Sequence, residues 1–462
     1  MKLLTILLLA ICIETFAQKE NNIWYFGDKA GIDFNYSNPI VLTNSSMQSL
    51  EGTATISDSS GNLLFYTNGG SHNLYLGAVW NKNHAIMPNG DLDNAGGCNS
   101  SAQSSLIVPN PNNSNQFYVF TTDCQENSMI GGFRYSIVDM TLDGGLGDIT
   151  LKGIQICDSV AESICGIKHI NGNDYWVIVH KLNNNSFYVY QITNSGILPP
   201  VITNIGLAAY SNAGQMTTSV DGSKIGYSAI GKTMLFDFDN STGMLSNYIN
   251  LNKYTFGCSF SANCRFFYAC YNAAPYDKIY QFDLYASNIP ASVFEIANST
   301  GTNGLCNMQL APNGKIYIAR MNSNYLDVIN NPDFSDTLSN YIANDFYLGG
   351  QLSKGGLPNF INGLFGQCSF NIGIEANYDS NSKSFNVYPN PFHSSTTLEF
   401  KNLKNEKHNL TVYNTCGHIL LLINNITTDK IKIERTNLTD GLYFFHLRTE
   451  RQIIATGKFI IE

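Results

Sequence analysis

The chain has 462 residues, enough for one large β domain and a smaller second domain. Charged residues make up 13% and aromatic residues 12%, which excludes a disordered chain, and 57 Asn with 39 Gly exclude a mainly helical one. The formal net charge of -9 offers no basic surface to neutralise phosphates, so the composition also argues against a nucleic-acid partner.

The N-terminus has the pattern of a secretory signal peptide over residues 1–17. Lys2 precedes a mostly apolar run at residues 3–13, and small residues follow as far as Ala17. We expect cleavage between Ala17 and Gln18. A helical membrane span needs roughly 20 apolar residues, so this run is too short and we expect no span in the mature chain.

Ten of the 11 cysteines follow the predicted cleavage site, and an exported chain passes through an oxidising compartment. Spacing favours disulfides between Cys258 and Cys270, across a predicted hairpin, and between Cys157 and Cys165, across a predicted loop. Buried free thiols are the alternative, since cysteine packs well as a small apolar residue. No CxxC, CxxH or HExxH occurs, so no zinc site is expected.

Seven segments repeat one pattern: an alternating apolar strand, a turn rich in Asn, Asp or Gly, and a second strand rich in Tyr and Phe. The turns at Asp221-Gly222 and Asn313-Gly314 are hairpin signals, because Asn and Gly accept positive φ at low cost. The repeats lie about 40 to 60 residues apart, close to the length of a four-stranded propeller blade. They start near Ala54, Gln103, Ile164, Ala213, Tyr254, Gly304 and Gly356.

This pattern predicts an all-β chain whose residues 18–370 form a seven-bladed β-propeller. The last repeat, residues 356–366, is too short for a blade. We therefore expect it to pair with the N-terminal strand at residues 23–34, so that residues 22–34 close the seventh blade and hide the open edges of the ring. Residues 371–384 carry no periodic pattern and are predicted to be a linker.

Residues 385–462 differ from the rest of the chain in charge and in pattern. They contain nine Lys or Arg and seven Asp or Glu, against 16 and 27 in residues 18–383. Short alternating segments such as STTLEF, HNLTVYN and LYFFHLR predict a small sandwich of about seven strands.

Four motifs of this tail occur in a specific order: NVYPNPF at 386–392, LTVYNTCGHIL at 410–420, DGLYFFHL at 440–447 and GKFII at 457–461. In this order the tail resembles the type A C-terminal sorting domain of type IX secretion cargo in Bacteroidota. The resemblance implies an immunoglobulin-like sandwich, recognition by the outer-membrane export machinery, and a location at the cell surface or in the medium. The implied sorting residues are Val387, Tyr388, Pro389, Asn390, Pro391, Gly417 and Gly441.

The larger region contains NNIWYFGDKAGIDFN at 21–35, NGNDYWVIVHKLNNNSFYVY at 171–190 and LAPNGKIYIA at 310–319. Through these segments it resembles the propeller-like ectodomains of secreted Bacteroidota proteins, with WD40-like or YVTN-like repeats. The resemblance implies a fold and no particular activity.

Few residues suggest a binding site. His169 and His180 flank the strand DYWVIV and could line one blade edge, and Trp80 could present a flat face to a sugar ring. Structural roles are the alternative for all three, because strand-end histidines commonly bond to the backbone and aromatic rings pack between blades. His72 and His84 have no third ligand at supporting spacing, so no metal residue is predicted.

No cofactor is expected, with calcium as a weak possibility. Residues 91–94 and 237–240 are acidic turns that lack the glycine and distant glutamate of an EF-hand. No GxSxG motif occurs and no catalytic residue is predicted, although carboxylates from different blades could still meet in the fold.

These observations predict an exported propeller that acts as a protein- or glycan-binding or adhesion module and not as an enzyme. The alternative is a secreted hydrolase or lyase acting on polysaccharide. Its test is whether two carboxylates, or a carboxylate and a histidine, gather in one pocket at the mouth of the ring.

Overall fold

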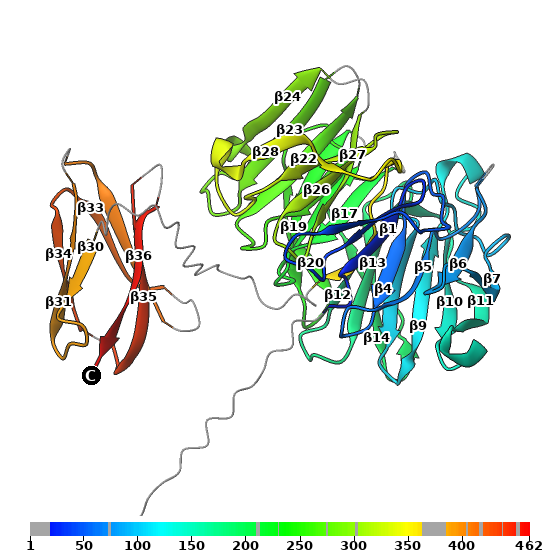
Figure 1. Ribbon diagram of the computed structural model, residues 1–462, viewed down its shortest axis with the longest axis horizontal. Coiled ribbons are helices and arrows are strands. Elements are labelled where there is room, and N and C mark those ends of the chain that lie inside the picture. Colours follow the sequence, from blue (N-terminus) through cyan, green and yellow to red (C-terminus); the bar gives the residue numbers. More distant parts are fainter. Residues whose placement is uncertain are drawn as a thin grey trace, which may run out of the picture. The chain divides into compact units, whose positions relative to one another are not determined.

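The computed structural model divides the chain into two compact units, residues 1–369 and residues 370–462 (Figure 1). It describes residues 19–72, 75–208, 213–229, 231–273, 276–300, 304–362, 385–402, 405–414, 419–436, 438–449 and 453–462. The predicted signal peptide, with Ala17 and Gln18, the predicted linker and Gly417 lie outside these residues.

Every regular element of the described residues is a β-strand or a short 3-10 helix, which confirms the all-β prediction. The short helices are η1 (Gln125–Asn127), η2 (Asp143–Gly145), η3 (Pro290–Ser292) and η4 (Asp336–Ser339).

The described strands of the first unit form seven sheets in chain order. The first sheet has β1 (Ile23–Phe26), β2 (Ala30–Asp33) and β3 (Ile40–Leu42). The next two have β4 (Ala54–Ser57), β5 (Leu63–Thr67), β6 (Ala78–Asn81) and β7 (Ile86–Asp91), then β8 (Ser105–Asn110), β9 (Asn113–Thr122), β10 (Phe133–Asp139) and β11 (Asp148–Cys157). The fourth has β12 (Val160–Lys168), β13 (Tyr175–Lys181), β14 (Ser186–Thr193), β15 (Gly196–Ile197) and β16 (Val201–Asn204), joined by β29 (Ile361–Asn362).

The last three sheets of this unit have four strands each. They are β17 (Gly214–Thr218), β18 (Lys224–Ala229), β19 (Lys232–Asp239) and β20 (Met244–Asn250); β21 (Gly257–Phe260), β22 (Phe266–Ala273), β23 (Tyr276–Asp283) and β24 (Phe294–Thr300); and β25 (Leu305–Leu310), β26 (Ile316–Arg320), β27 (Tyr325–Ile329) and β28 (Tyr341–Tyr347).

The sheets contact one another through their first strands. β1 contacts β4, β4 contacts β8, β8 contacts β12, and the series continues through β17 and β21 to β25. Neighbouring strands of each four-stranded sheet follow in chain order and pair antiparallel, so each sheet is a meander that starts on the inside. This radial order of meanders is propeller-like.

Tight turns set the register of these meanders. Asp221-Gly222 joins β17 to β18 and Asn313-Gly314 joins β25 to β26, with φ of 69° at Gly222 and 77° at Gly314. A side chain with a Cβ is disfavoured at such angles, so glycine permits the turn. Both predicted hairpins are therefore confirmed.

Strand β1 packs between the first and the last four-stranded sheets, and its alternating side chains divide between them. Trp24 and Phe26 lie in one buried cluster with residues of β26 and β27. Ile23 and Tyr25 lie in another with residues of β5 and β6. Because successive strand side chains point to opposite faces, one short strand fills both seams.

The predicted pairing of residues 23–34 with residues 356–366 is wrong for the described strands. β1 pairs with β2, and β2 with β3, so the N-terminal residues form a sheet by themselves. The end of the first unit contacts this sheet through a bridge between Asp28 and Leu352 and through side-chain packing, such as the ring contact of Trp24 with Phe360, and not as a paired strand. The short repeat instead adds β29 to β12 as a parallel strand.

Residues 355–362, which we call the axial segment, run along the first strands of four sheets. The Gly355 amide donates to the Leu50 carbonyl before β4 (2.8 Å), and β29 pairs with β12. The Asn362 side chain donates to the Thr218 carbonyl at the end of β17 (3.0 Å). The segment therefore follows these strands from their beginnings to their ends and occupies the axis of the ring.

Asn359 is the main polar contact of the axial segment. Its backbone amide donates to the Thr53 carbonyl (2.8 Å), and its side-chain amide donates to the carbonyls of Ser105 (3.2 Å) and Ile164 (2.8 Å). One buried residue thus ties together strands from three sheets. The approach is close: a Cβ on Gly356 would lie 1.7 Å from the Glu51 carbonyl oxygen, so only glycine fits there.

The second unit consists of two sheets with a shared core. Leu398, Ile433, Val412 and Phe445 are fully buried between the sheets. One sheet has the order β30 (Phe385–Tyr388), β31 (Ser395–Phe400) and β34 (Lys430–Glu434). The other has β33 (Ile419–Ile426), β32 (His408–Tyr413), β35 (Gly441–Arg448) and β36 (Ile453–Ile461).

The structure contains a disulfide between Cys98 and Cys124, which the sequence analysis did not predict. The predicted pair of Cys258 and Cys270 does not form, because both are free thiols. In the register of β21 and β22, Cys258 faces Ala269 while Cys270 faces Gly257, so the two sulfurs lie on opposite faces of the sheet.

The other predicted pair, Cys157 with Cys165, does not form either. Cys157 ends β11, the last strand of one sheet, and Cys165 lies in β12, the first strand of the next. Closeness in sequence therefore does not bring these two sulfurs together.

His180 is buried without a hydrogen-bond partner between the sheets that begin with β12 and β17. It is 0% exposed, and both ring nitrogens lack a partner. Its ring lies 4.5 Å from the Phe187 ring and 5.4 Å from the Tyr227 ring, between centroids. Burial, aided by the positive charge of Lys232, lowers the pKa of His180 from 6.5 to about 4.

Replacing Asn359 with alanine should lower the free energy of unfolding by about 2 to 3 kcal/mol, because two buried carbonyls lose their donor. Urea denaturation of the purified chain measures the change. Asn112→Ala, at an exposed turn residue, is the matched control and should leave stability within about 0.5 kcal/mol. Equal stability of the two variants would contradict the role given to Asn359.

Replacing His180 with phenylalanine should remove part of the acid sensitivity of the fold. The unfolded state binds a proton at His180 below pH 6.5 but the folded state only near pH 4, so stability falls as pH drops through this window. Relative to His180→Phe, the wild type should lose about 2 to 3 kcal/mol between pH 7.5 and pH 4.5. Denaturant curves of both proteins at the two pH values measure this difference, and parallel losses would refute the assignment.

Candidate functional site

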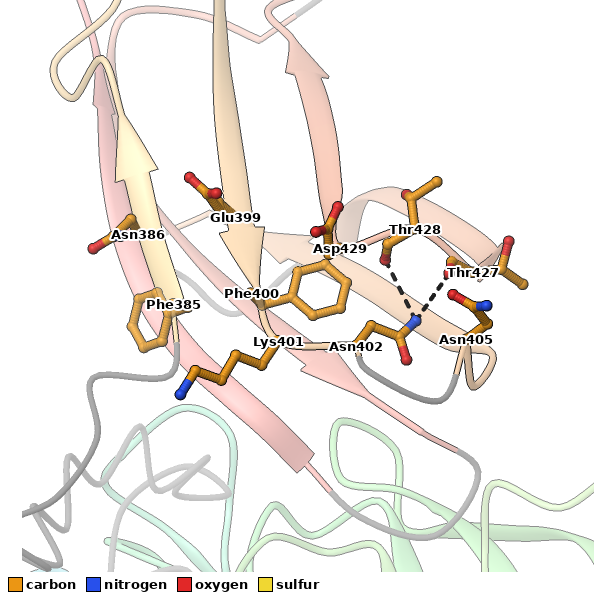
Figure 2. Close-up of a pocket in the computed structure, with 10 residues that line it drawn as sticks. All are labelled: Phe385, Asn386, Glu399, Phe400, Lys401, Asn402, Asn405, Thr427, Thr428 and Asp429. Carbon is orange, nitrogen blue, oxygen red and sulfur yellow. Dashed lines mark hydrogen bonds between the residues drawn. The ribbon is translucent and has the colours of Figure 1, made fainter.

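The second unit has a hollow of about 830 Å³. In Figure 2 the Asn402 side chain donates to the carbonyls of Thr427 (3.0 Å) and Thr428 (3.4 Å). Glu399 forms an ion pair with Lys430 (2.9 Å), which lies outside the lining. The lining residues of the hollow are Phe385, Asn386, Glu399, Phe400, Lys401, Asn402, Asn405, Thr427, Thr428 and Asp429.

The first unit has a cavity of about 460 Å³ at the end of the ring where the first strands begin. We call it the acidic pocket; it is lined by Glu51, Ser100, Gln125, Glu126, Glu162 and Ala213. These residues come from four successive sheets. Glu51 precedes β4, Ser100 precedes β8, and η1, which carries Gln125 and Glu126, lies between β9 and β10 of the same sheet as β8. Glu162 lies in β12, and Ala213 precedes β17. A volume of this size is within the range of small-ligand sites.

Glu162, the third residue of β12, is held by backbone donors. It is 2% exposed, and its two carboxyl oxygens accept hydrogen bonds from the amides of Gln125 (2.9 Å) and Ala102 (3.1 Å). Burial raises the pKa of Glu162 to about 7, against the opposing effect of these two bonds. These two bonds fix the orientation of the Glu162 carboxyl in the pocket wall.

Glu51 lies just before β4 and next to the axial segment. Its Oε2 atom is buried and has no hydrogen-bond partner. Burial, together with the negative charges of Glu162 and Glu126, raises the pKa of Glu51 well above its usual value. The surroundings of Glu51 therefore favour the protonated form of this carboxyl group.

Glu126 is the exposed carboxyl group of the pocket. It accepts a hydrogen bond from the Ser100 hydroxyl (2.9 Å). The disulfide between Cys98 and Cys124 joins the segment that carries Ser100 to η1, which carries Glu126. A covalent link thus fixes this wall of the pocket.

The three glutamates are not arranged as ligands of a single cation. Among the described residues, their ligand atoms do not gather within 4.8 Å of one another, as a bound metal would require. The groups available to a ligand are the Glu51 carboxyl, the Glu126 carboxyl and the Ser100 hydroxyl. They can accept hydrogen bonds from hydroxyl or ammonium groups, and Glu51 can also donate a proton.

The two predicted histidines lie at opposite ends of β13 and do not form a common site. His169 stacks against Trp176 (5.1 Å between ring centroids), and its Nδ1 accepts a bond from the Asn171 amide (2.9 Å). His180 lies at the other end, between the sheets that begin with β12 and β17. His169 bonds to the backbone, as the alternative interpretation proposed, whereas His180 only packs against aromatic rings.

Trp80 and the acidic turns also have structural contacts. Trp80 is buried and stacks on Tyr66 (5.5 Å between centroids, planes 13° apart). Asp237 forms an ion pair with Lys224 (2.6 Å), and the Asp91 carboxylate accepts a bond from the Asp93 amide (2.7 Å). These contacts are typical of core packing and of turns.

The predicted sorting residues connect the beginning of the second unit to its end. Val387 and Tyr388 lie in β30, and Pro389 and Pro391 both follow cis peptide bonds. The Asn390 side chain accepts a bond from the Ile460 amide (2.8 Å) and donates to the Lys458 carbonyl (3.2 Å). The first and last motifs of the tail are therefore parts of one contact.

Sequence reasoning missed the acidic pocket. Glu51 and Glu162 lie three and two residues from the predicted repeat starts at Ala54 and Ile164, so an alignment of repeats on their first strands would have placed both carboxyls at one end of the ring. Glu126 lies in a loop outside the repeat pattern. The disulfide, which spacing did not suggest, and the bond from the Gln125 amide to Glu162 hold it at the same place.

Comparison with known families identifies the second unit. Residues 386–462 match the family model of the secretion system C-terminal sorting domain. No curated protein matches the chain.

Solved structures with similar folds include proposed 6-phosphogluconolactonases from Bacteroides uniformis (12% identity, TM-score 0.47, 71% of this chain and 98% of that one) and Bacteroides fragilis (10% identity, TM-score 0.48, 74% and 98%). A third is the Cps50 (Swd1) β-propeller domain of Myceliophteria thermophila (9% identity, TM-score 0.35, 65% and 94%). Because these TM-scores are all below 0.5, the propeller-like description of the first unit is based on the contacts between its sheets.

The part of the chain that the structure describes has no helix long and apolar enough to cross a bilayer. The sorting-domain match gives the location: this chain is cargo of type IX secretion, delivered by its C-terminal domain to the cell surface or the extracellular space.

Proposed function

We propose that the first unit is a seven-bladed β-propeller that binds a glycan or a protein in its acidic pocket, and that the chain acts as an exported binding module. The observation that carries this proposal is the convergence of Glu51, Glu126 and Glu162 from three different sheets on one cavity at the end of the axis. Carboxyl groups in a fixed, partly dry cavity recognise donors such as sugar hydroxyls or the ammonium groups of a protein.

The position of the pocket supports binding from one face of the ring. The axial segment fills the axis beyond Glu51, so a ligand would enter from the end where the first strands begin. Asn362, the last residue of this unit that the structure describes, lies beside Thr218 at the other end of the strands.

Two features support an immunoglobulin-like fold for the second unit. In chain order, strands one, two and five form one sheet and the other four form the second, as in Greek-key sandwiches. The Tyr443 hydroxyl donates to the Thr439 carbonyl (2.6 Å) near the start of β35, which is the geometry of a tyrosine corner. We also propose a source in Bacteroidota, a type A sorting signal, removal of residues 1–17 and a linker at 371–384.

A second candidate function is an enzyme that cleaves polysaccharide. The observation that favours it is that Glu51, whose pKa is raised, shares a cavity with the exposed carboxyl of Glu126. An acid with a raised pKa beside another carboxyl group is the arrangement used for general acid and base catalysis in glycoside hydrolysis.

Binding should depend on the pocket glutamates. Glu126→Gln in the full exported chain should weaken binding on glycan arrays or in pull-downs by about tenfold or more, since a bond to a charged acceptor is lost. Glu434→Gln, at an exposed glutamate of the second unit, is the matched control. Equal binding by both variants would exclude the pocket. New reducing ends that appear with the wild type and vanish with Glu51→Gln would favour the enzyme instead.

Deletion of residues 385–462 should retain the folded first unit in the periplasm, because the match to the sorting domain lies within the deleted residues. Immunoblots of periplasm, cell surface and medium measure the distribution, with the full chain as control. Normal secretion of the truncated chain would contradict the role of the tail.

A further inference from the structure

The described residues that line the acidic pocket supply three carboxyl groups and no basic side chain. The carboxyl groups are those of Glu51, Glu126 and Glu162. Burial raises the pKa of Glu51 and of Glu162, and the charged groups that raise it further are all carboxylates. The pocket therefore favours a ligand with a positive charge and disfavours an anionic one, such as an acidic glycan.

One carboxyl oxygen of the pocket has no partner among the described residues. The Oε2 atom of Glu51 is buried and accepts no hydrogen bond from them, although Glu51 lines the cavity. A buried acceptor without a donor costs free energy, and a donor on a ligand would remove this cost. A positive charge on the same ligand would also stabilise the ionised form of the Glu51 carboxyl. Both effects favour an ammonium group at Glu51.

The acceptors are spread over the cavity and not gathered at one point. The three carboxyl groups come from different sheets, and among the described residues their oxygens do not all lie within 4.8 Å of one another. A ligand with donors on several atoms can reach more of these oxygens than a single ammonium ion can. A sugar ring has this property, because its hydroxyl and amino groups lie on successive carbon atoms.

The rest of the lining is mostly polar. The Ser100 hydroxyl donates to Glu126 (2.9 Å), so its oxygen can still accept a bond, and the Gln125 side chain can both donate and accept. Among the described lining residues, only Ala213 is apolar. A lysine side chain buries its methylene groups against apolar surface, which these walls lack, whereas the hydroxyl groups of a sugar find partners here. The lining therefore fits an amino sugar better than the lysine side chain of a protein.

We propose that the acidic pocket binds an amino sugar whose amine is free, with the ammonium group at the carboxyls of Glu51 and Glu126. The hydroxyl groups of the sugar then bond to Ser100 and Gln125. This inference rests on the binding function proposed above for the same pocket and names the class of ligand. N-acetylation of the sugar weakens binding, because it removes the positive charge and puts a carbonyl acceptor next to carboxyl groups.

The test measures binding of the full exported chain to a glucosamine trimer by isothermal titration calorimetry. The comparison probes are an N-acetylglucosamine trimer, a glucose trimer and a trilysine peptide. We expect the glucosamine trimer to bind at least about tenfold more tightly than the two uncharged trimers, since hydrogen bonds between charged groups are roughly twice as strong as neutral ones. It should also bind more tightly than trilysine, because the walls of the pocket are polar.

The pocket glutamates should be needed for this affinity. Glu126→Gln and Glu51→Gln should each weaken binding of the glucosamine trimer by about tenfold or more. Glu295→Gln, at an exposed glutamate of β24, makes the same change of charge outside the pocket and should bind as the wild type does. Thermal unfolding checks that each variant is folded. Glu126 is exposed, so Glu126→Gln keeps the test decisive if Glu51→Gln proves unstable.

Two results would overturn the amino-sugar assignment and leave the binding function of the pocket in place. One is that an uncharged trimer or trilysine binds as tightly as the glucosamine trimer and is still weakened by Glu126→Gln. The other is that none of the four probes binds, while glycan-array or pull-down binding still depends on Glu126. If Glu295→Gln weakens glucosamine binding as much as Glu126→Gln does, net charge explains the affinity and the assignment is wrong.

Discussion

The structure depends on strand β1, which belongs to two seams at once. Trp24 and Phe26 fill the contact with the last four-stranded sheet, and Ile23 and Tyr25 fill the contact with the first. Without this strand, two sheets would expose apolar faces, since a sheet in a ring is stable only when both neighbours cover it. The seams and the axis are therefore closed separately, the seams by the N-terminal strand and the axis by residues 355–362.

The acidic pocket is a consequence of the same geometry. First strands of successive sheets begin at one end of the axis, so residues just before or within them converge whatever their distance in sequence. Glu51 and Glu162 meet in this way, and burial beside the axial segment then raises the pKa of the Glu51 carboxyl. The disulfide of Cys98 and Cys124 adds Glu126 from a loop. The packing of the sheets determines where the site lies, and loop residues provide part of its functional groups.

Much of the fold follows from local pattern. Hairpin turns such as Asp221-Gly222 and the alternation of apolar residues placed the first strands of six sheets within four residues of where they begin, because register within a meander is set by neighbours in sequence. The closure could not be found this way. Residues 356–366 and the N-terminal strand are both short and apolar, and their periodicity does not say whether they pair with each other or with other strands. The disulfide predictions failed for a related reason, since spacing does not reveal which face of a sheet Cys258 or Cys270 occupies.

By itself, the sequence determined that the chain is an all-β protein built from repeated meanders and that its last residues direct export, since both depend on order and spacing along the chain. The tertiary structure alone decided which strand closes the ring, that Asn359 ties three sheets together on the axis, and that three glutamates share one cavity. The physical reason is that these features join residues far apart in sequence, and contacts of that kind are fixed by how the sheets pack and not by the local preferences of the chain.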